Sequence, residues 1–286
     1  MSLKNVTQRL SQVSAKIHKA PVDTIEWPES VEPSSAWFTS PKLMTIAGTS
    51  FETSLNEQTR RRLSFFEAVN FYSLNINGEK PLVEGLNKRL YAKGQARLLP
   101  YLHHFLDEEN KHMQFFGRFC MSYSGKVYKD KKISFPRTYV EGEEDFLFFA
   151  KVVIFEEIAD YFNILQAADE NLHPVARKIN LLHHQDEARH LTFGRQLVLE
   201  LFEEKKTVWS TETLQGISIY LLSYMVATWK EYYNPEMYRD AGLSDSYEMM
   251  TEAWNCEAQK NLRREASSKC IRFFLDTGII TEEPDL

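Results

Sequence analysis

The sequence predicts an all-α protein built around a four-helix bundle. Apolar residues recur at helical spacing in long segments, and no strand-like alternation of any length interrupts them. No Gly-rich phosphate loop and no G-x-S-x-G turn is present. Two pentads nearly repeat, Glu108-Glu109-Asn110-Lys111-His112 and Asp186-Glu187-Ala188-Arg189-His190, and each reads acid, Glu, any residue, base, His. Such a repeat predicts two similar helices that face each other in a bundle.

Composition narrows the functional class. The chain has 286 residues, of which 43% are hydrophobic and 26% charged, so it can bury a sizeable core. A net charge of −6 argues against a general nucleic-acid surface. The three cysteines form no C-x-x-C pair, which predicts no disulfide framework and fits a reducing cytoplasm. The N-terminus lacks the apolar core of a signal peptide, and the run from Ile217 to Trp229 is too short to span a bilayer.

Two regions are expected along the chain. Residues 1–50 contain four scattered prolines and two tryptophans, which predicts an extended N-terminal arm wrapped over the bundle. Residues 51–286 are expected to form a single helical domain. Within it, the capping box Ser54-x-x-Glu57 predicts the start of the first core helix, which runs to about Leu74. A shorter helix is expected after Pro81.

The later elements follow from caps and breakers. A loop rich in Lys and Gly is expected over 122–140. Pro174 is a favourable first residue for a helix, and Asn234-Pro235 is expected to end one. The expected helices, in chain order, cover residues 95–121, 143–170, 174–204, 211–233 and 246–275.

The paired pentads predict a metal site. Glu and His three residues apart lie on one face of a helix, about one turn from each other. Two such pairs on facing helices, with one more Glu from each of two other helices, form the carboxylate-rich two-metal site of four-helix bundles. Glu67 and Glu156 are the candidates for the additional acids, because each lies in a strongly apolar helical stretch. A buried carboxylate is costly unless a cation pairs with it.

A third histidine joins the expected site. His183 lies four residues before Glu187 and seven before His190, so the three side chains share a stripe roughly 60° wide. His184 would widen that stripe to about 120°, which makes His183 the better candidate.

This arrangement resembles the ferritin-like di-iron N-oxygenases related to p-aminobenzoate N-oxygenase, over roughly residues 55 to 265. The family pattern is Glu, Glu-x-x-His, Glu and His-x-x-x-Glu-x-x-His. Here it is met by Glu67, Glu109, His112, Glu156, His183, Glu187 and His190. The family spacing before the additional His, 183 − 156 = 27 here, favours Glu156 over Glu157. The ordinary di-iron pattern is shared with many oxidases and ferritins, and His183 singles out the N-oxygenase branch.

The resemblance implies an O₂-activating non-haem di-iron oxygenase that N-oxygenates an arylamine-type small molecule through a peroxo-diferric intermediate. It implies two iron ions (Fe2+/Fe3+) as cofactor and O₂ as co-substrate. One iron would take both imidazoles of the fourth helix. Electrons would come from an external donor or reductase, because no flavin or nicotinamide motif is visible. We also expect a cytoplasmic homodimer with no nucleic-acid or membrane partner.

Two other functions stay open at this point. One keeps the metals but hydroxylates or desaturates C–H bonds. The other is an iron-storage or peroxide-scavenging ferritin-like protein, and substrate turnover measured against iron loading would separate it from an enzyme.

Several neighbouring residues have expected roles. Resembling di-iron proteins use the acid before each Glu in a crossed manner, so we expect Asp186 to support His112 and Glu108 to support His190. Arg62 is a candidate substrate contact, with a solvated basic turn as the alternative. We expect Glu157 and Asp160 to lie on a solvated face. His103 and His104 are expected to be partly exposed residues that bind no metal.

Overall fold

The computed structural model describes residues 3–17, 21–92, 96–129 and 137–286. The all-α prediction is confirmed: within these ranges no strand forms, and the only sheet-like pairing is an isolated bridge between Trp37 and Leu172. Some residues of the expected segments lie outside the described ranges. They are residues 1–2 and 18–20 of the expected arm, residues 130–136 of the expected loop, and the expected helix start at residue 95.

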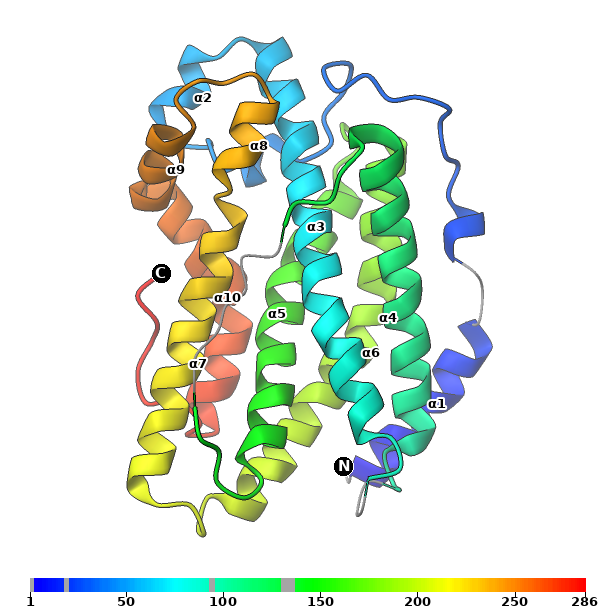
Figure 1. Ribbon diagram of the computed structural model, residues 1–286, viewed down its shortest axis with the longest axis vertical. Helices are drawn as coiled ribbons and strands as arrows, with labels where there is room; N and C mark the ends of the chain where they lie inside the picture. The colour runs from blue at the N-terminus through cyan, green and yellow to red at the C-terminus, as the bar shows by residue number, and fades with distance from the viewer. Residues whose placement is uncertain (1–2, 18–20, 93–95, 130–136) are drawn as a thin grey trace.

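Four long helices form the central bundle (Figure 1). They are α3 (Glu57–Arg89), α4 (Leu99–Phe119), α5 (Glu143–Ala168) and α6 (Pro174–Lys205). Helices α4 and α5 run in the same direction (Figure 1), so the end of α4 and the start of α5 lie at opposite ends of the bundle. One long crossover of this kind is the connectivity of ferritin-like bundles.

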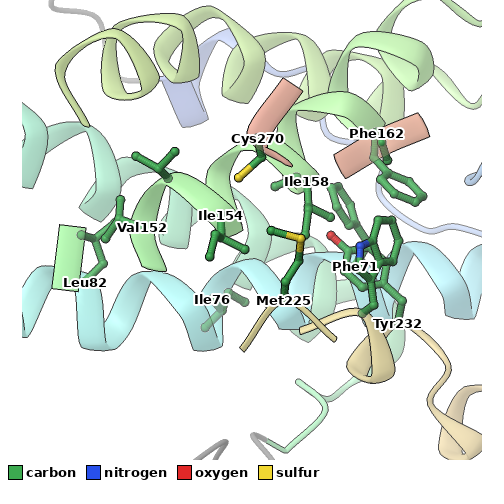
Figure 2. Packing of buried hydrophobic residues seen from close by; sticks show 14 of the residues in the cluster. Phe71, Ile76, Leu82, Val152, Ile154, Ile158, Phe162, Met225, Tyr232 and Cys270 are labelled. Atoms are coloured by element: carbon green, nitrogen blue, oxygen red, sulfur yellow. The ribbon is translucent and has the colours of Figure 1, made fainter. Parts of the chain in front are cut away.

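The remaining helices pack around this bundle (Figure 1). Helix α7 (Thr211–Tyr232) and helix α10 (Glu257–Asp276) lie against α5. Two shorter helices, α8 (Pro235–Asp240) and α9 (Ser246–Asn255), connect α7 to α10, and the short helix α2 (Ser50–Ser54) precedes α3. Buried side chains of α3, α5 and α7, such as Ile76, Ile154 and Met225, meet between these helices (Figure 2).

The beginning of the expected arm is helical instead of extended. Helix α1 (Leu3–Ile17) packs against α4 and α6 and buries Leu3, Val6 and Leu10. These residues lie three and four apart, so they form one apolar helix face, which outweighs the proline-rich character of the rest of the arm. Farther along, Trp37 accepts a hydrogen bond from the backbone of His173, which ties the arm to the start of α6.

The first core helix is longer than predicted. Its N-cap is Asn56, whose side chain accepts a hydrogen bond from the Thr59 amide at 2.9 Å, so the expected Ser54 capping box is wrong. The helix also continues through Pro81 without a break. A proline inside a helix costs about 3 kcal/mol, and burial of Leu82 and Leu86 against the bundle offsets that cost.

Two glycines let α3 approach α5 closely. A Cβ at Gly78 would lie 2.5 Å from the ring of Phe155, and a Cβ at Gly85 would lie 2.1 Å from the ring of Phe148. The glycines are seven residues apart on α3, and the phenylalanines are seven apart on α5. Each ring therefore occupies the space that a larger residue would fill.

The C-terminal region is divided where one helix was expected. The predicted 246–275 helix is two helices, α9 and α10, because Cys256 adopts an extended backbone conformation (φ −64°, ψ 133°) between them. Asn234 ends α7 as expected, and its side chain accepts a hydrogen bond from Glu236 that caps α8. In the described part of the chain, no helix combines the length and apolar character needed to cross a bilayer.

Candidate metal centre

Acidic and histidine side chains from all four bundle helices meet inside the protein. Three overlapping groups have ligand atoms that lie within 4.8 Å of one another. The first is Glu109, His112, Glu187 and His190; the second is Glu79, His112 and His183; the third is Glu156, His183 and Glu187. All seven side chains are buried. The structure therefore brings together six of the seven residues expected from the sequence.

The seventh expected residue is corrected. Glu79, and not Glu67, is the acid of α3 that lies with the others. Glu67 comes 12 residues earlier, which is about 18 Å along a helix axis. Its carboxylate instead accepts hydrogen bonds from the Thr45 amide at 3.0 Å and the Thr45 hydroxyl at 2.5 Å. Sequence reasoning missed Glu79 because Asn77-Gly78 and Pro81 suggest a break where the helix continues.

Each imidazole is held by one ring nitrogen and turns the other toward the cluster. Nε2 of His112 lies 3.1 Å from Asp186, and Nε2 of His190 lies 2.9 Å from Glu108. The crossed hydrogen bonds expected from the sequence are thus present. Nδ1 of His183 lies 2.7 Å from the Asn163 amide, a partner that sequence reasoning did not find.

The cluster atoms are short of hydrogen bonds. Within the part of the chain that the structure describes, neither carboxylate oxygen of the four glutamates has a hydrogen-bond partner outside the cluster. Their short contacts are with histidines of the cluster: His190 Nδ1 lies 2.8 Å from Glu109, and His183 Nε2 lies 2.9 Å from Glu187. The same is true of His112 Nδ1, His190 Nδ1 and His183 Nε2. Buried polar groups are normally hydrogen-bonded, so this concentration at one point needs a cause. Bound cations would supply partners for these converging atoms.

Burial and mutual charge divide the carboxyl groups into two kinds. Burial raises the pKa of Glu79 and Glu156 well above the ordinary value, and neighbouring carboxylates raise it further. Burial acts in the same direction on Glu109 and Glu187, but the adjacent imidazoles lower the pKa of both acids overall. In the metal-free protein, protons thus neutralise part of a charge that metal ions would otherwise balance.

Arg189 connects the two outer acids. It forms ion pairs with Glu108 at 2.8 Å and with Asp186, and its Nε donates to the Ser14 hydroxyl of α1. Arg189 is the base of the second pentad. It is buried, so both carboxylates that orient the histidines remain charged in a dry environment.

The outer carboxylates should contribute measurably to metal binding. We expect Asp186→Asn to weaken iron binding by about 10–100-fold, because His112 loses the anion that fixes its tautomer and orientation. A titration against a competing chelator would measure the change. Asp107→Asn is the matched control, since Asp107 pairs with Lys111 and lies outside the cluster. Equal affinities for the two variants would contradict a supporting role for Asp186.

Two acids of α5 differ from their expected setting. Glu157 and Asp160 are buried, and not on a solvated face. Glu157 forms an ion pair with Arg195, and Asp160 lies 2.6 Å from Nδ1 of His184. Both acids therefore have cationic or hydrogen-bonding partners outside the metal cluster.

A cavity of about 360 Å³ lies between α3, α5 and α7. Its wall includes Gly78, directly before Glu79, and Val152, one turn before Glu156. Arg62, the expected substrate contact, does not line it: its side chain is exposed and lies 3.4 Å from the Asp240 carbonyl.

The comparison with protein families gives one match over nearly the whole chain. The sequence model of the p-aminobenzoate N-oxygenase AurF family matches residues 2–278. The match includes α1 and the arm, as well as the four bundle helices. A search of curated proteins finds no match.

Proposed function

The chain belongs to the p-aminobenzoate N-oxygenase AurF family of di-iron N-oxygenases, and we propose that its two iron ions lie between the four bundle helices. The proposed ligands are the buried side chains whose unpaired atoms converge, Glu79, Glu109, His112, Glu156, His183, Glu187 and His190. The single observation that carries this assignment is the convergence of buried oxygen and nitrogen atoms that have no hydrogen-bond partner outside the cluster.

The donor set suits iron in number, charge and type. Four carboxylates bring a charge of −4, which balances two Fe2+ ions, while neutral imidazoles add none. Oxygen and imidazole nitrogen donors together suit iron. Nε2–H of His112 and His190 can donate to the outer acids and leave Nδ1 free to bind metal. A half-turn of the Asn163 amide would present its oxygen to Nδ1–H of His183 and leave Nε2 free.

The three groups overlap. His112 shares one group with His190 and another with His183, and Glu187 likewise shares groups with both of these histidines. The seven side chains would therefore hold two ions close together. The expectation that one iron takes both imidazoles of the fourth helix stays a prediction.

The protein surrounds this centre with aromatic rings. Phe105 stacks on His190 with ring centroids 4.1 Å apart, and Phe116 contacts His183 edge to face at 5.0 Å. Such walls exclude water and strengthen the electrostatic interactions inside. The bound iron would supply the redox chemistry that reduces O₂ and oxidises an amine nitrogen. The chain's own residues would hold the histidines neutral, keep the site dry and position the amine.

Membership of the family implies that the substrate is a small molecule. We propose that it is an arylamine, held in the cavity whose wall includes Gly78, directly before Glu79, and Val152, one turn before Glu156. O₂ as co-substrate, an external electron donor, a homodimer and a cytoplasmic location stay predictions.

Iron loading and product analysis together test the function. We expect about two iron ions per chain after anaerobic reconstitution with Fe2+, and fewer than about one would contradict the site. The loaded protein, given O₂, a chemical reductant and p-aminobenzoate, should produce N-oxygenated products that mass spectrometry detects. Metal-free protein is the control. Full iron loading without any N-oxygenated arylamine would contradict the proposed substrate class.

A further inference from the structure

The cavity between α3, α5 and α7 and the proposed metal cluster lie on neighbouring faces of the same two helices. Gly78 lines the cavity and directly precedes Glu79 on α3. Phe155 lines it and directly precedes Glu156 on α5. Consecutive residues of a helix point about 100° apart. Of the three helices that line the cavity, only α3 and α5 carry proposed ligands, so a molecule in the cavity reaches the metals through the contact between these two helices.

The ring of Phe155 fills this contact end-on. A Cβ added to Gly78 would lie 2.5 Å from Cζ of the ring and 2.8 Å from each of its two Cε atoms. The ring thus extends from α5 to α3 and ends against the glycine, where a larger residue would leave it no room. At the level of Glu79 and Glu156, this ring therefore occupies the gap between the two helices.

Phe155 is held less firmly than the corresponding ring seven residues earlier. Phe148 also lines the cavity, and its ring lies on Gly85. Cζ of Arg89 lies 3.9 Å from the Phe148 ring centroid, and Phe149 packs edge to face on the same ring at 4.9 Å. Within the described ranges, Phe155 has no such aromatic or cationic contact, and its side chain is partly exposed. Exposed side chains change rotamer readily, so Phe155 is the part of this wall that is free to move.

The cavity itself does not limit a ligand to one ring. Its volume of about 360 Å³ falls within the range of about 300–1,000 Å³ that is usual for sites of drug-sized ligands. Any selection by width must then occur at the passage from the cavity to the metals.

We propose that the Phe155 ring is a gate between the cavity and the metal cluster and limits the width of the amines that reach the irons. The ring moves off Gly78 to admit a single aromatic ring, and two fused rings exceed the gap that this movement opens. The inference rests on the proposed function for the identity of the metals and of the reacting nitrogen. It assigns size selection to a residue that neither binds metal nor carries a polar group.

Removal of iron by a wide chelator measures this passage without any turnover. Iron-loaded protein without O₂ would be mixed with 2,2′-bipyridine, and the iron left on the protein would be measured after gel filtration at successive times. We expect Phe155→Ala to lose iron at least about tenfold faster than the wild type, which corresponds to about 1.4 kcal/mol off the barrier. Phe148→Ala is the matched control and should lose iron at the wild-type rate, since Phe148 lies about two turns farther from Glu156.

A narrow chelator separates a gate from a weakened metal site. Cyanide also binds Fe2+ strongly but is much narrower than two pyridine rings. It should remove iron at similar rates from the wild type, Phe155→Ala and Phe148→Ala. Phe155→Leu, a smaller change to the fold, should show a smaller acceleration with bipyridine and none with cyanide.

A methyl group returned to the gap should reverse the effect. In the Phe155→Ala protein, Gly78→Ala has no ring to displace, so its Cβ would occupy part of the space that the ring filled. The double variant should lose iron to bipyridine more slowly than Phe155→Ala alone. Gly85→Ala added to Phe148→Ala is the matched pair, with the same exchange of glycine for alanine in α3, and should leave the rate unchanged.

Two uncharged amines test the selection in the reaction itself. Aniline has one ring, and 2-aminonaphthalene has two fused rings. Phe155→Ala should raise the ratio of N-oxygenated 2-aminonaphthalene to N-oxygenated aniline by at least about tenfold, the scale on which pocket size discriminates between substrates. Phe148→Ala should leave this ratio near the wild-type value.

The outcomes separate this inference from the function on which it rests. Equal bipyridine rates for the wild type and Phe155→Ala, faster iron loss to cyanide as well, or an unchanged product ratio would overturn the gate. Access of bipyridine that depends on Phe155, in a protein that oxidises no amine, would support the gate and contradict only the proposed reaction.

Discussion

Glu79→Gln is expected to lower iron affinity by more than about 100-fold, because a ligand contributes more than the outer partners that are worth about 10–100-fold. The substitution removes a negative charge from a group that includes His112 and His183. Glu187→Gln should lose at least as much, since Glu187 belongs to two of the groups. Iron content after reconstitution and a chelator titration would measure both effects.

Glu67→Gln is the matched control on the same helix. Glu67 is also a buried acid of α3, but its carboxylate bonds to Thr45 and belongs to none of the groups found in the described ranges. The variant should bind iron like the wild type. Loss of iron from Glu67→Gln with retention in Glu79→Gln would restore the ligand expected from the sequence and refute the one assigned from the structure.

Glu67 should instead make stability depend on pH. Burial raises the pKa of Glu67 to about 8, although the hydrogen bonds from Thr45 oppose the shift. An unfolded Glu titrates near 4.5, so between that pH and about 8 the folded protein binds the additional proton. The free energy of unfolding must then fall as pH rises through this window. At about 1.4 kcal/mol per pH unit, the contribution lost between pH 5 and 8 is about 3 kcal/mol.

The difference between two proteins isolates this contribution. The free energy of unfolding of the metal-free wild type and of metal-free Glu67→Gln would be measured with urea at pH 5 and pH 8. Both proteins contain the same titrating groups of the metal cluster, so the contribution of those groups cancels in the difference between the two proteins. The wild type should lose about 3 kcal/mol more than the variant over this range. Parallel pH profiles would show that Glu67 ionises normally in the folded protein.

Local sequence determined most of the fold and the shared part of the site. Periodic apolar residues specify a helix before any tertiary contact forms, and Pro174 and Asn234 specify where helices begin and end. The Glu-x-x-His spacing places two ligands on one helix face by geometry alone, so Glu109 with His112 and Glu187 with His190 could be assigned from the chain.

Tertiary packing decided what local signals could not. The continuation of α3 through Pro81 depends on burial against α5, where Gly78 accepts the ring of Phe155, and this long-range contact outweighs the local preference for a break. The continuation of α3 beyond Leu74 brings Glu79 to the other residues of the proposed metal cluster, while Glu67 lies near Thr45. The partner of His183 is likewise on another helix, because Asn163 belongs to α5. Such a contact depends on distances in space, which spacing along the chain does not encode.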